Sequence, residues 1–182
     1  MKYISIDIET YSSVDISKAG LYKYVQSFDF AILLFAYSVD GGSVQIVDLA
    51  QGEEIPLDII SALGDINVTK YAYNAAFEQY CLSKYYTTPI YQWRCTMVQG
   101  LYCGYPAGLS ATGEAFGLSE DKRKLSTGNA LIRNFCVPCK PTTTNGCRIR
   151  NFPHHVPEKW ELFKEYCKQD VVTELAVNNL LP

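Results

Sequence analysis

Two acidic residues stand two positions apart in an otherwise apolar stretch near the start of the chain. The stretch reads ISIDIETYS over residues 4–12, and the acids are Asp7 and Glu9. Because side chains alternate along a strand, both carboxylates would face one side and the isoleucines the other. Like charges at this spacing repel and are costly to bury, so a hydrated divalent ion between them would relieve both costs. The alternative is that the strand ends in solvent, where both acids are hydrated.

Two further groups of residues carry polar side chains beside apolar ones. In the segment NAAFE, Asn74 is placed to cap a helix, Phe77 to anchor it in the core, and Glu78 to lie in its first turn, where the helix dipole favours an acid. Tyr166 and Asp170 are four residues apart, so they share one face of a C-terminal helix. Each group alone also has a purely structural interpretation.

The composition predicts one globular domain. The chain has 182 residues, of which 48% are hydrophobic and 19% charged, and the net charge of −3 gives no general nucleic-acid signal. A basic binding face would therefore be local. The seven cysteines are an odd number, and neither a signal peptide nor a membrane-spanning run is apparent. We therefore expect a cytoplasmic protein with free thiols and no membrane association.

The hydrophobic pattern predicts the elements that position these residues. Strands are expected at 3–8, 30–39, 44–49 and 67–74, with the second and third joined in a hairpin by Asp40-Gly41-Gly42. Helices are expected at 19–25, 56–63, 75–86, 97–102, 109–116 and 158–181. The last helix carries an apolar stripe formed by Trp160, Phe163, Cys167, Val171 and Leu175.

Residues 119–157 differ from the rest of the chain. They are rich in basic residues and prolines, with Glu120 and Asp121 as the only acids. We expect a long loop region with a helix near 126–135, since long loops in compact domains commonly carry function. Lys140 and Arg148 in this region could follow the phosphates of a nucleic-acid strand. The alternative is a solvated charged loop.

The three motifs in this order resemble the tyrosine-bearing branch of the DEDD superfamily of 3′–5′ exonucleases. The chain looks most like the N-terminal proofreading domain of phage-type family A DNA polymerases, through DIETYSSVDISKAGLYKYVQS, NAAFE, KPTTTNGCRIRN and PEKWELFKEYCKQDV. The resemblance implies an α/β, ribonuclease-H-like fold whose mixed central sheet, three antiparallel strands and then parallel strands, is flanked by helices. It also implies a single exonuclease domain over residues 1–182, either excised from a larger DNA polymerase or standing alone.

The resemblance assigns roles to particular residues. It implies that Asp7, Glu9, Glu78 and Asp170 hold two divalent ions, Mg²⁺ or Mn²⁺, and that Tyr166 orients the attacking water. Glu78 departs from the family, which usually has aspartate there. For substrate binding it implies a set of residues that hold the terminal nucleotide and the strand: Thr10, Asn74, Phe77, Lys140 and Arg148. The implied partner is single-stranded DNA or a frayed 3′ end, in a bacterial cell and encoded by a phage or prophage, with a polymerase domain covalently linked.

Three alternatives stay open. Glu78 could mark a nucleic-acid-binding domain whose exonuclease is disabled. The same acids also serve enzymes that trim RNA. From a different class, Cys136, Cys139 and Cys147 with His154 or His155 could bind zinc in a metal-stabilised binding module, although the second half of that pattern is not a paired motif.

Overall fold

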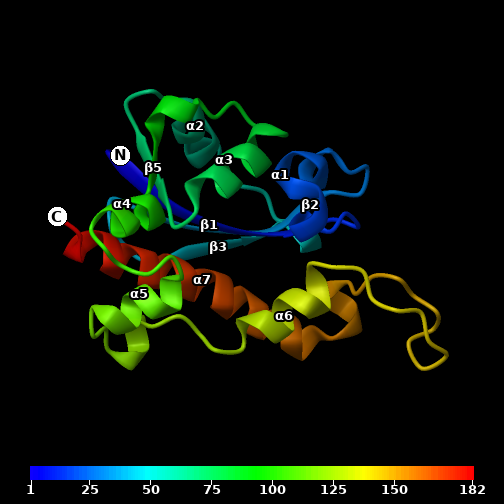
Figure 1. Cartoon of the computed structure of the whole chain (residues 1–182). Helices are drawn as coiled ribbons and strands as arrows, with labels where there is room; N and C mark the ends of the chain where they lie inside the picture. The colour runs from blue at the N-terminus through cyan, green and yellow to red at the C-terminus, as the bar shows by residue number, and fades with distance from the viewer.

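The computed structural model describes residues 1–182 and shows a five-stranded sheet with helices on both faces (Figure 1). The strand order is β3-β2-β1-β4-β5, which places β1 at the centre. The strands are β1 Tyr3–Tyr11, β2 Ala31–Val39, β3 Gln45–Asp48, β4 Thr69–Ala72 and β5 Trp93–Cys95. The pairs β1–β2 and β2–β3 are antiparallel, whereas β1–β4 and β4–β5 are parallel. The predicted mixed sheet is therefore confirmed.

Helices fill the connections between and after the strands. They are α1 Ile16–Gln26, α2 Leu57–Gly64, α3 Ala75–Ser83, α4 Thr96–Tyr102, α5 Leu109–Ala115, α6 Gly128–Phe135 and α7 Pro157–Leu180. Short 3₁₀ turns occur at Leu49–Gln51, Ile90–Gln92, Glu120–Lys122 and Pro153–His155. None of the helices combines the length and the apolar character that a membrane span needs.

The two faces of the sheet bury separate apolar clusters. Ile4, Ile6 and Ile8 pack toward α2 and α3 with residues such as Ile59 and Leu82. On the other face α7 crosses under the sheet (Figure 1), and its predicted apolar stripe is buried against β2 and α6, apart from the partly buried Leu175. This arrangement leaves Asp7 and Glu9 on the α7 side of β1, as the alternation predicts.

Most predicted elements are present, with two differences. Helix α1 starts earlier than expected, because a first helical turn precedes the predicted segment. The two pieces meet at Gly20, whose φ of 81° is not helical. Strand β5 was not predicted, because three residues give no periodic pattern and the strand forms only by pairing with β4. The 119–157 region contains α6 close to the predicted position, and most of its remainder is irregular.

Candidate active site

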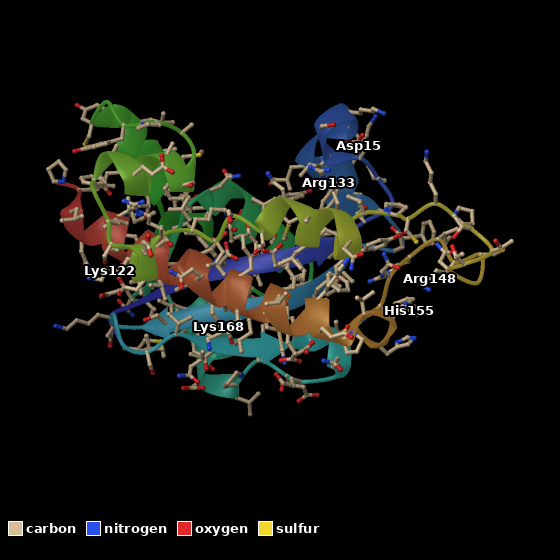
Figure 2. The ribbon with its side chains drawn as sticks, turned by 90° about the horizontal axis from the view of Figure 1, so that it is seen from below. Asp15, Lys122, Arg133, Arg148, His155 and Lys168 are labelled. Atoms are coloured by element: carbon tan, nitrogen blue, oxygen red, sulfur yellow. The ribbon has the colours of Figure 1, made fainter.

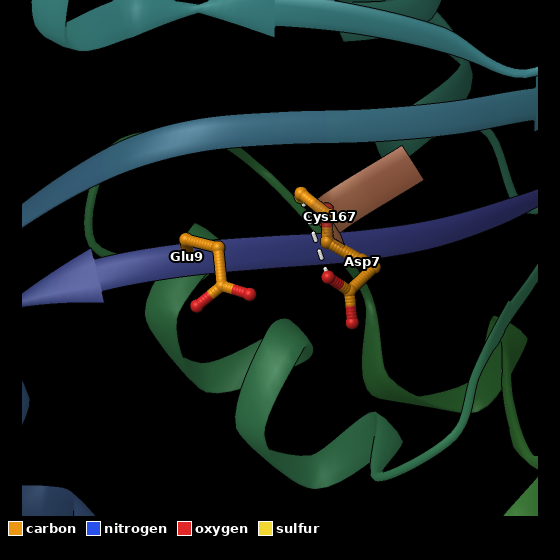
Figure 3. A group of neighbouring side chains, drawn as sticks. All are labelled: Asp7, Glu9 and Cys167. Carbon is orange, nitrogen blue, oxygen red and sulfur yellow. Dashed lines mark hydrogen bonds between the residues drawn. The ribbon is translucent and has the colours of Figure 1, made fainter. Parts of the chain in front are cut away.

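Strand β1 presents Asp7 and Glu9 on the same side, toward α7 (Figure 3). One oxygen of each carboxylate and the Sγ atom of Cys167 lie within 4.8 Å of one another. The Cys167 thiol donates to Oδ2 of Asp7 at 3.3 Å, and the Cys136 thiol approaches Oε2 of Glu9 at 3.8 Å. The register of β1 against β2 shifts between Glu9 and Thr10, and such an irregularity locally re-aims side chains.

The parallel neighbour β4 brings the second motif to the same place. Ser5 pairs with Tyr71, so the chain leaves β4 at the level where β1 reaches its acids and then enters α3. Asn74 occupies the N-cap position of α3 as expected, but its side chain makes no capping hydrogen bond. Asn74 is one of the residues that line the cavity beside the acids. Glu78, in the first turn of α3, is 5% exposed.

Helix α7 supplies the third motif. Tyr166 and Asp170 are both buried and one turn apart on the face toward β1. The Tyr166 ring packs on Phe163, with centroids 6.1 Å apart and planes inclined by 13°. Asp170 forms an ion pair with Lys124 through Oδ2, whereas its Oδ1 is buried without a hydrogen-bond partner.

A cavity of about 650 Å³ joins the three motifs. Its lining includes most residues that the sequence singled out: Asp7, Glu9, Thr10, Asn74, Phe77, Glu78, Tyr166 and Asp170. The lining also includes residues 12–16 and, from α6 and the segment after it, Ile132, Cys136, Val137 and Pro138. The hydroxyl of Thr10 is hydrogen-bonded to the hydroxyl of Tyr24 at 2.7 Å and is therefore already engaged.

The clustered acids raise one another's pKa values. Burial is the largest cause for Asp7, Glu9 and Glu78, and the charges of neighbouring carboxylates raise their pKa further. Burial also raises the pKa of Asp170, although the Lys124 ammonium opposes this. Burial and the nearby carboxylates raise the pKa of Tyr166, so its hydroxyl stays protonated. The site therefore favours a cation among these side chains.

Lys124 is the site residue that sequence reasoning missed. Its ammonium lies 4.8 Å from the centroid of the Tyr166 ring and pairs with Asp170. Burial disfavours the ammonium, but the charges of Asp170, Asp7 and Glu9 outweigh this effect and raise the pKa of Lys124. Gln169 on α7 holds the preceding segment by donating to the carbonyls of Asp121 and Arg123, at 2.8 and 3.0 Å. In the sequence, Lys124 is one member of a basic run, and no spacing distinguishes it.

Two predicted strand-binding residues, Lys140 and Arg148, do not line the cavity. They lie in the loop that follows α6, where Arg148 donates to the carbonyl of Asn145 at 3.0 Å and to Oδ1 of Asn151 at 2.8 Å. Figure 2 places Arg148 beyond Arg133 of α6, at the end of the molecule where Asp15 also lies.

The structure does not bring the residues of the zinc alternative together into a group of close ligands. Cys136 is buried against Glu9. The thiol of Cys139 donates a hydrogen bond to the carbonyl of Arg148, and Cys147 is exposed. In residues 1–182, the one group of three or more possible metal ligands within 4.8 Å of one another is Asp7, Glu9 and Cys167, and it contains none of the residues of the zinc alternative. The two cysteines of the Cys-x-x-Cys motif do not share a site, because the first belongs to the core beneath α6 and the second to the loop.

Sequence comparison relates this chain to part of a DNA polymerase. No protein-family model matches the chain. A DNA polymerase from Bacillus phage SP02 is 52% identical over 181 residues, which cover 98% of this chain and 28% of that protein. The chain is a homologue of one part of a phage DNA polymerase. It thus spans a little more than a quarter of the length of this polymerase relative.

Solved structures agree on the fold of this polymerase-related chain. Trypanosoma brucei RNase D, in a complex with RNA U12, superimposes with a TM-score of 0.60 at 18% identity, over 99% of this chain and 55% of that one. A nuclease in its apo form gives a TM-score of 0.57 at 17% identity, over 97% and 70% of the two chains. The resemblance to exonucleases of the ribonuclease-H-like fold is therefore confirmed for the fold, and the resemblance to phage polymerases is confirmed by the relative.

Proposed function

We propose that the chain is a metal-dependent 3′–5′ exonuclease that removes nucleotides from the 3′ end of single-stranded or frayed DNA. The observation that supports this most strongly is the convergence of four carboxylates from β1, α3 and α7 on one cavity, with Tyr166 beside them. A purely structural cluster would pair its buried acids with cations or hydrogen-bond donors. Here Glu78 Oε2 is buried without a partner, and so is Oδ1 of Asp170, whose other oxygen pairs with Lys124.

The donor set fits divalent metal ions. Carboxylate oxygens are the ligands that Mg²⁺ and Mn²⁺ prefer, and the unpartnered oxygens of Glu78 and Asp170 are free to bind them. Cys167 is placed as a hydrogen-bond donor to Asp7, and burial raises the pKa of its thiol, which disfavours a thiolate ligand. We therefore assign Asp7, Glu9, Glu78 and Asp170 as the residues that hold two such ions.

Bound divalent ions supply charge relief at the phosphate and a bound water of lowered pKa. The protein supplies orientation. Because the Tyr166 hydroxyl stays protonated, it can donate to and position the attacking water but cannot take its proton. Phe77, whose ring lies 6.3 Å from that of Tyr24, offers an apolar surface to the terminal base, and Asn74 offers an amide.

The DNA substrate and a proofreading role are supported by the phage polymerase relative. We also propose that the exonuclease acts together with a polymerase domain on the same polypeptide, in a bacterial cell in which phage DNA is replicated. Nothing in the cavity lining reads base edges in a defined pattern, so little sequence preference is expected.

The test uses one sequence as single-stranded DNA and as RNA, each labelled at either end, with Mg²⁺. A 3′–5′ exonuclease releases a 3′ label at once as a mononucleotide and shortens a 5′-labelled strand stepwise. We expect this pattern with DNA. Faster trimming of RNA would contradict the substrate assignment, and release of internal fragments from either label would contradict the exonuclease.

A further inference from the structure

Arg150 lies between two aromatic rings at the end of β1 that follows the acids. Its guanidinium carbon is 3.8 Å from the centroid of Tyr11 and 4.6 Å from that of Phe152. The Nε atom is buried and donates no hydrogen bond. Asp29 is the acid whose charge acts on Arg150, but its carboxylate is engaged by Ser13 and Ser27. The charge of Arg150 is therefore not neutralised by a bonded acid.

Phe152 continues this stack outward to two histidines. The rings of Phe152 and His154 are inclined by 7° with centroids 6.0 Å apart, and His154 lies 4.1 Å from His155. The backbone of Phe152 donates to Nδ1 of His155 at 2.8 Å, which fixes the turn. Phe152 is 42% exposed, and His154 is exposed. Exposed planar rings beside arginine form the kind of surface on which nucleobases of single strands stack.

This surface continues the wall of the catalytic cavity. The wall includes Cys136, Val137 and Pro138, and the next residue, Cys139, pairs through its backbone with Ile149 at 2.8 Å. Asn151 donates to the carbonyl of Asn134 on α6 at 2.9 Å. The loop is therefore fixed to α6, with Arg148 and His155 near each other beyond Arg133 (Figure 2).

Strand β1 also leads from the catalytic acids toward this surface. Tyr11, on which Arg150 stacks, is two residues beyond Glu9, or about 7 Å along the strand. A nucleic-acid strand whose 3′ end lies at the acids and which leaves between α1 and α6 would therefore reach Arg150 after a short distance.

We propose that Arg150, Phe152 and His154 form a second nucleotide-binding subsite, which holds a nucleotide 5′ to the scissile bond of single-stranded DNA. The exposed surfaces of Phe152 and His154 pack on the face of its base, and Arg150 contacts the adjoining phosphate. This inference rests on the proposed exonuclease function. Because stacking uses the face of a base, the subsite tolerates every base.

The test separates this subsite from the catalytic centre. The p-nitrophenyl ester of thymidine 5′-monophosphate fills only the terminal site, whereas oligothymidylates of stepwise increasing length extend to the subsite. Phe152→Ala is the main variant, because Phe152 is exposed and its loss leaves the core intact. Tyr102→Ala is the matched control, since Tyr102 is 94% exposed and belongs to α4, away from the loop (Figure 1).

We expect Phe152→Ala to hydrolyse the ester like the wild type and to bind the longer oligonucleotides roughly ten-fold more weakly. The wild type and Tyr102→Ala should show a step in affinity at the length that reaches the loop, and Phe152→Ala should lack it. Unchanged binding by Phe152→Ala would overturn the subsite, as would an equal loss of ester hydrolysis, which indicates a structural role.

The two proposals fail in different ways. If the wild type hydrolyses neither substrate but shows the Phe152-dependent step in binding, the subsite stands and the exonuclease does not. Arg150→Met gives an independent readout, because it keeps an unbranched side chain of similar length beside the two rings and removes the charge. It should reduce the slope of log affinity against log salt by about 0.7, the value for one phosphate contact on a single strand, and an unchanged slope would contradict the phosphate contact.

Discussion

The ring of Tyr166 lies directly on the backbone of Gly128. A Cβ atom placed on Gly128 would be 2.1 Å from Cε2 of the ring and 2.8 Å from the hydroxyl oxygen. Gly128 is buried and is the first residue of α6, so the start of this helix covers the tyrosine that α7 brings to the site. The glycine is required here for close approach, since no side chain fits between the two segments.

Gly128→Ala should therefore displace Tyr166 and reduce kcat roughly a hundred-fold, because small misplacements of positioning groups have large effects on rate. If Gly128 acts through Tyr166, the double variant with Tyr166→Phe should be no slower than Tyr166→Phe alone. Multiplicative losses in this double-mutant cycle would contradict the link. Gly108→Ala is the matched control, since its nearest neighbour would be 4.0 Å away, at Cβ of Ala111.

Asp7→Ala should abolish turnover and leave folding intact. The variant loses the hydrogen bond from Cys167, but it also removes one of the carboxylates whose charges oppose one another. In EDTA its free energy of unfolding should lie within about 1 kcal/mol of the wild type or above it. Urea unfolding in EDTA measures this, and a much larger drop would show that Asp7 is needed for the fold.

Glu78→Asp should keep or raise the exonuclease rate, because it restores the acid that the family usually carries at this position. Glu78→Ala should be much slower, since it removes a carboxylate that lines the cavity and has one unpartnered oxygen. Steady-state rates with Mg²⁺ compare the two variants. An inactive Glu78→Asp beside an active Glu78→Ala would remove Glu78 from the metal ligands.

Glu174 makes the stability of the protein depend on pH. It lies one turn beyond Asp170 on α7, and burial raises its pKa to about 7, although a hydrogen bond from Thr96 opposes the shift. A raised pKa means that the folded state favours the proton. The stabilisation is therefore complete below the unfolded value of about 4.3 and is lost as pH rises through about 7.

Glu174→Gln keeps an acceptor for Thr96 and removes the ionisation. In EDTA the wild type should lose up to about 3 kcal/mol more stability than Glu174→Gln between about pH 5 and pH 8. Urea unfolding at both pH values tests the difference. Parallel losses in the two proteins would show that Glu174 does not titrate in this range.

The parts of the site that follow local patterns could be predicted from the sequence. Alternation along β1 places Asp7 and Glu9 together, and helical spacing places Tyr166 and Asp170 on one face. Glu174 could have been predicted in the same way, since it is four residues after Asp170. That the three motifs lie close together was predicted from the resemblance to a known family and not from the residues alone.

The remaining features depend on the path of the chain through irregular segments. Lys124 reaches Asp170 from the irregular segment before α6, which Gln169 binds through the carbonyls of Asp121 and Arg123. Gly128 contacts Tyr166 because α6 packs on α7, and no spacing of residues in the sequence predicts this contact. Strand β5 depends on an adjacent strand already being in place. Such features need the tertiary structure because their partners are distant in sequence.

The measurement that tests the central claim most directly is a time course on 5′-labelled single-stranded DNA with Mg²⁺, with Mn²⁺ and with EDTA, beside Asp7→Ala. We predict a ladder that shortens one nucleotide at a time from the 3′ end with either metal. It should be absent with EDTA and in the variant. No ladder with either metal while the DNA stays bound, or a ladder that persists in Asp7→Ala, would contradict an exonuclease at this site.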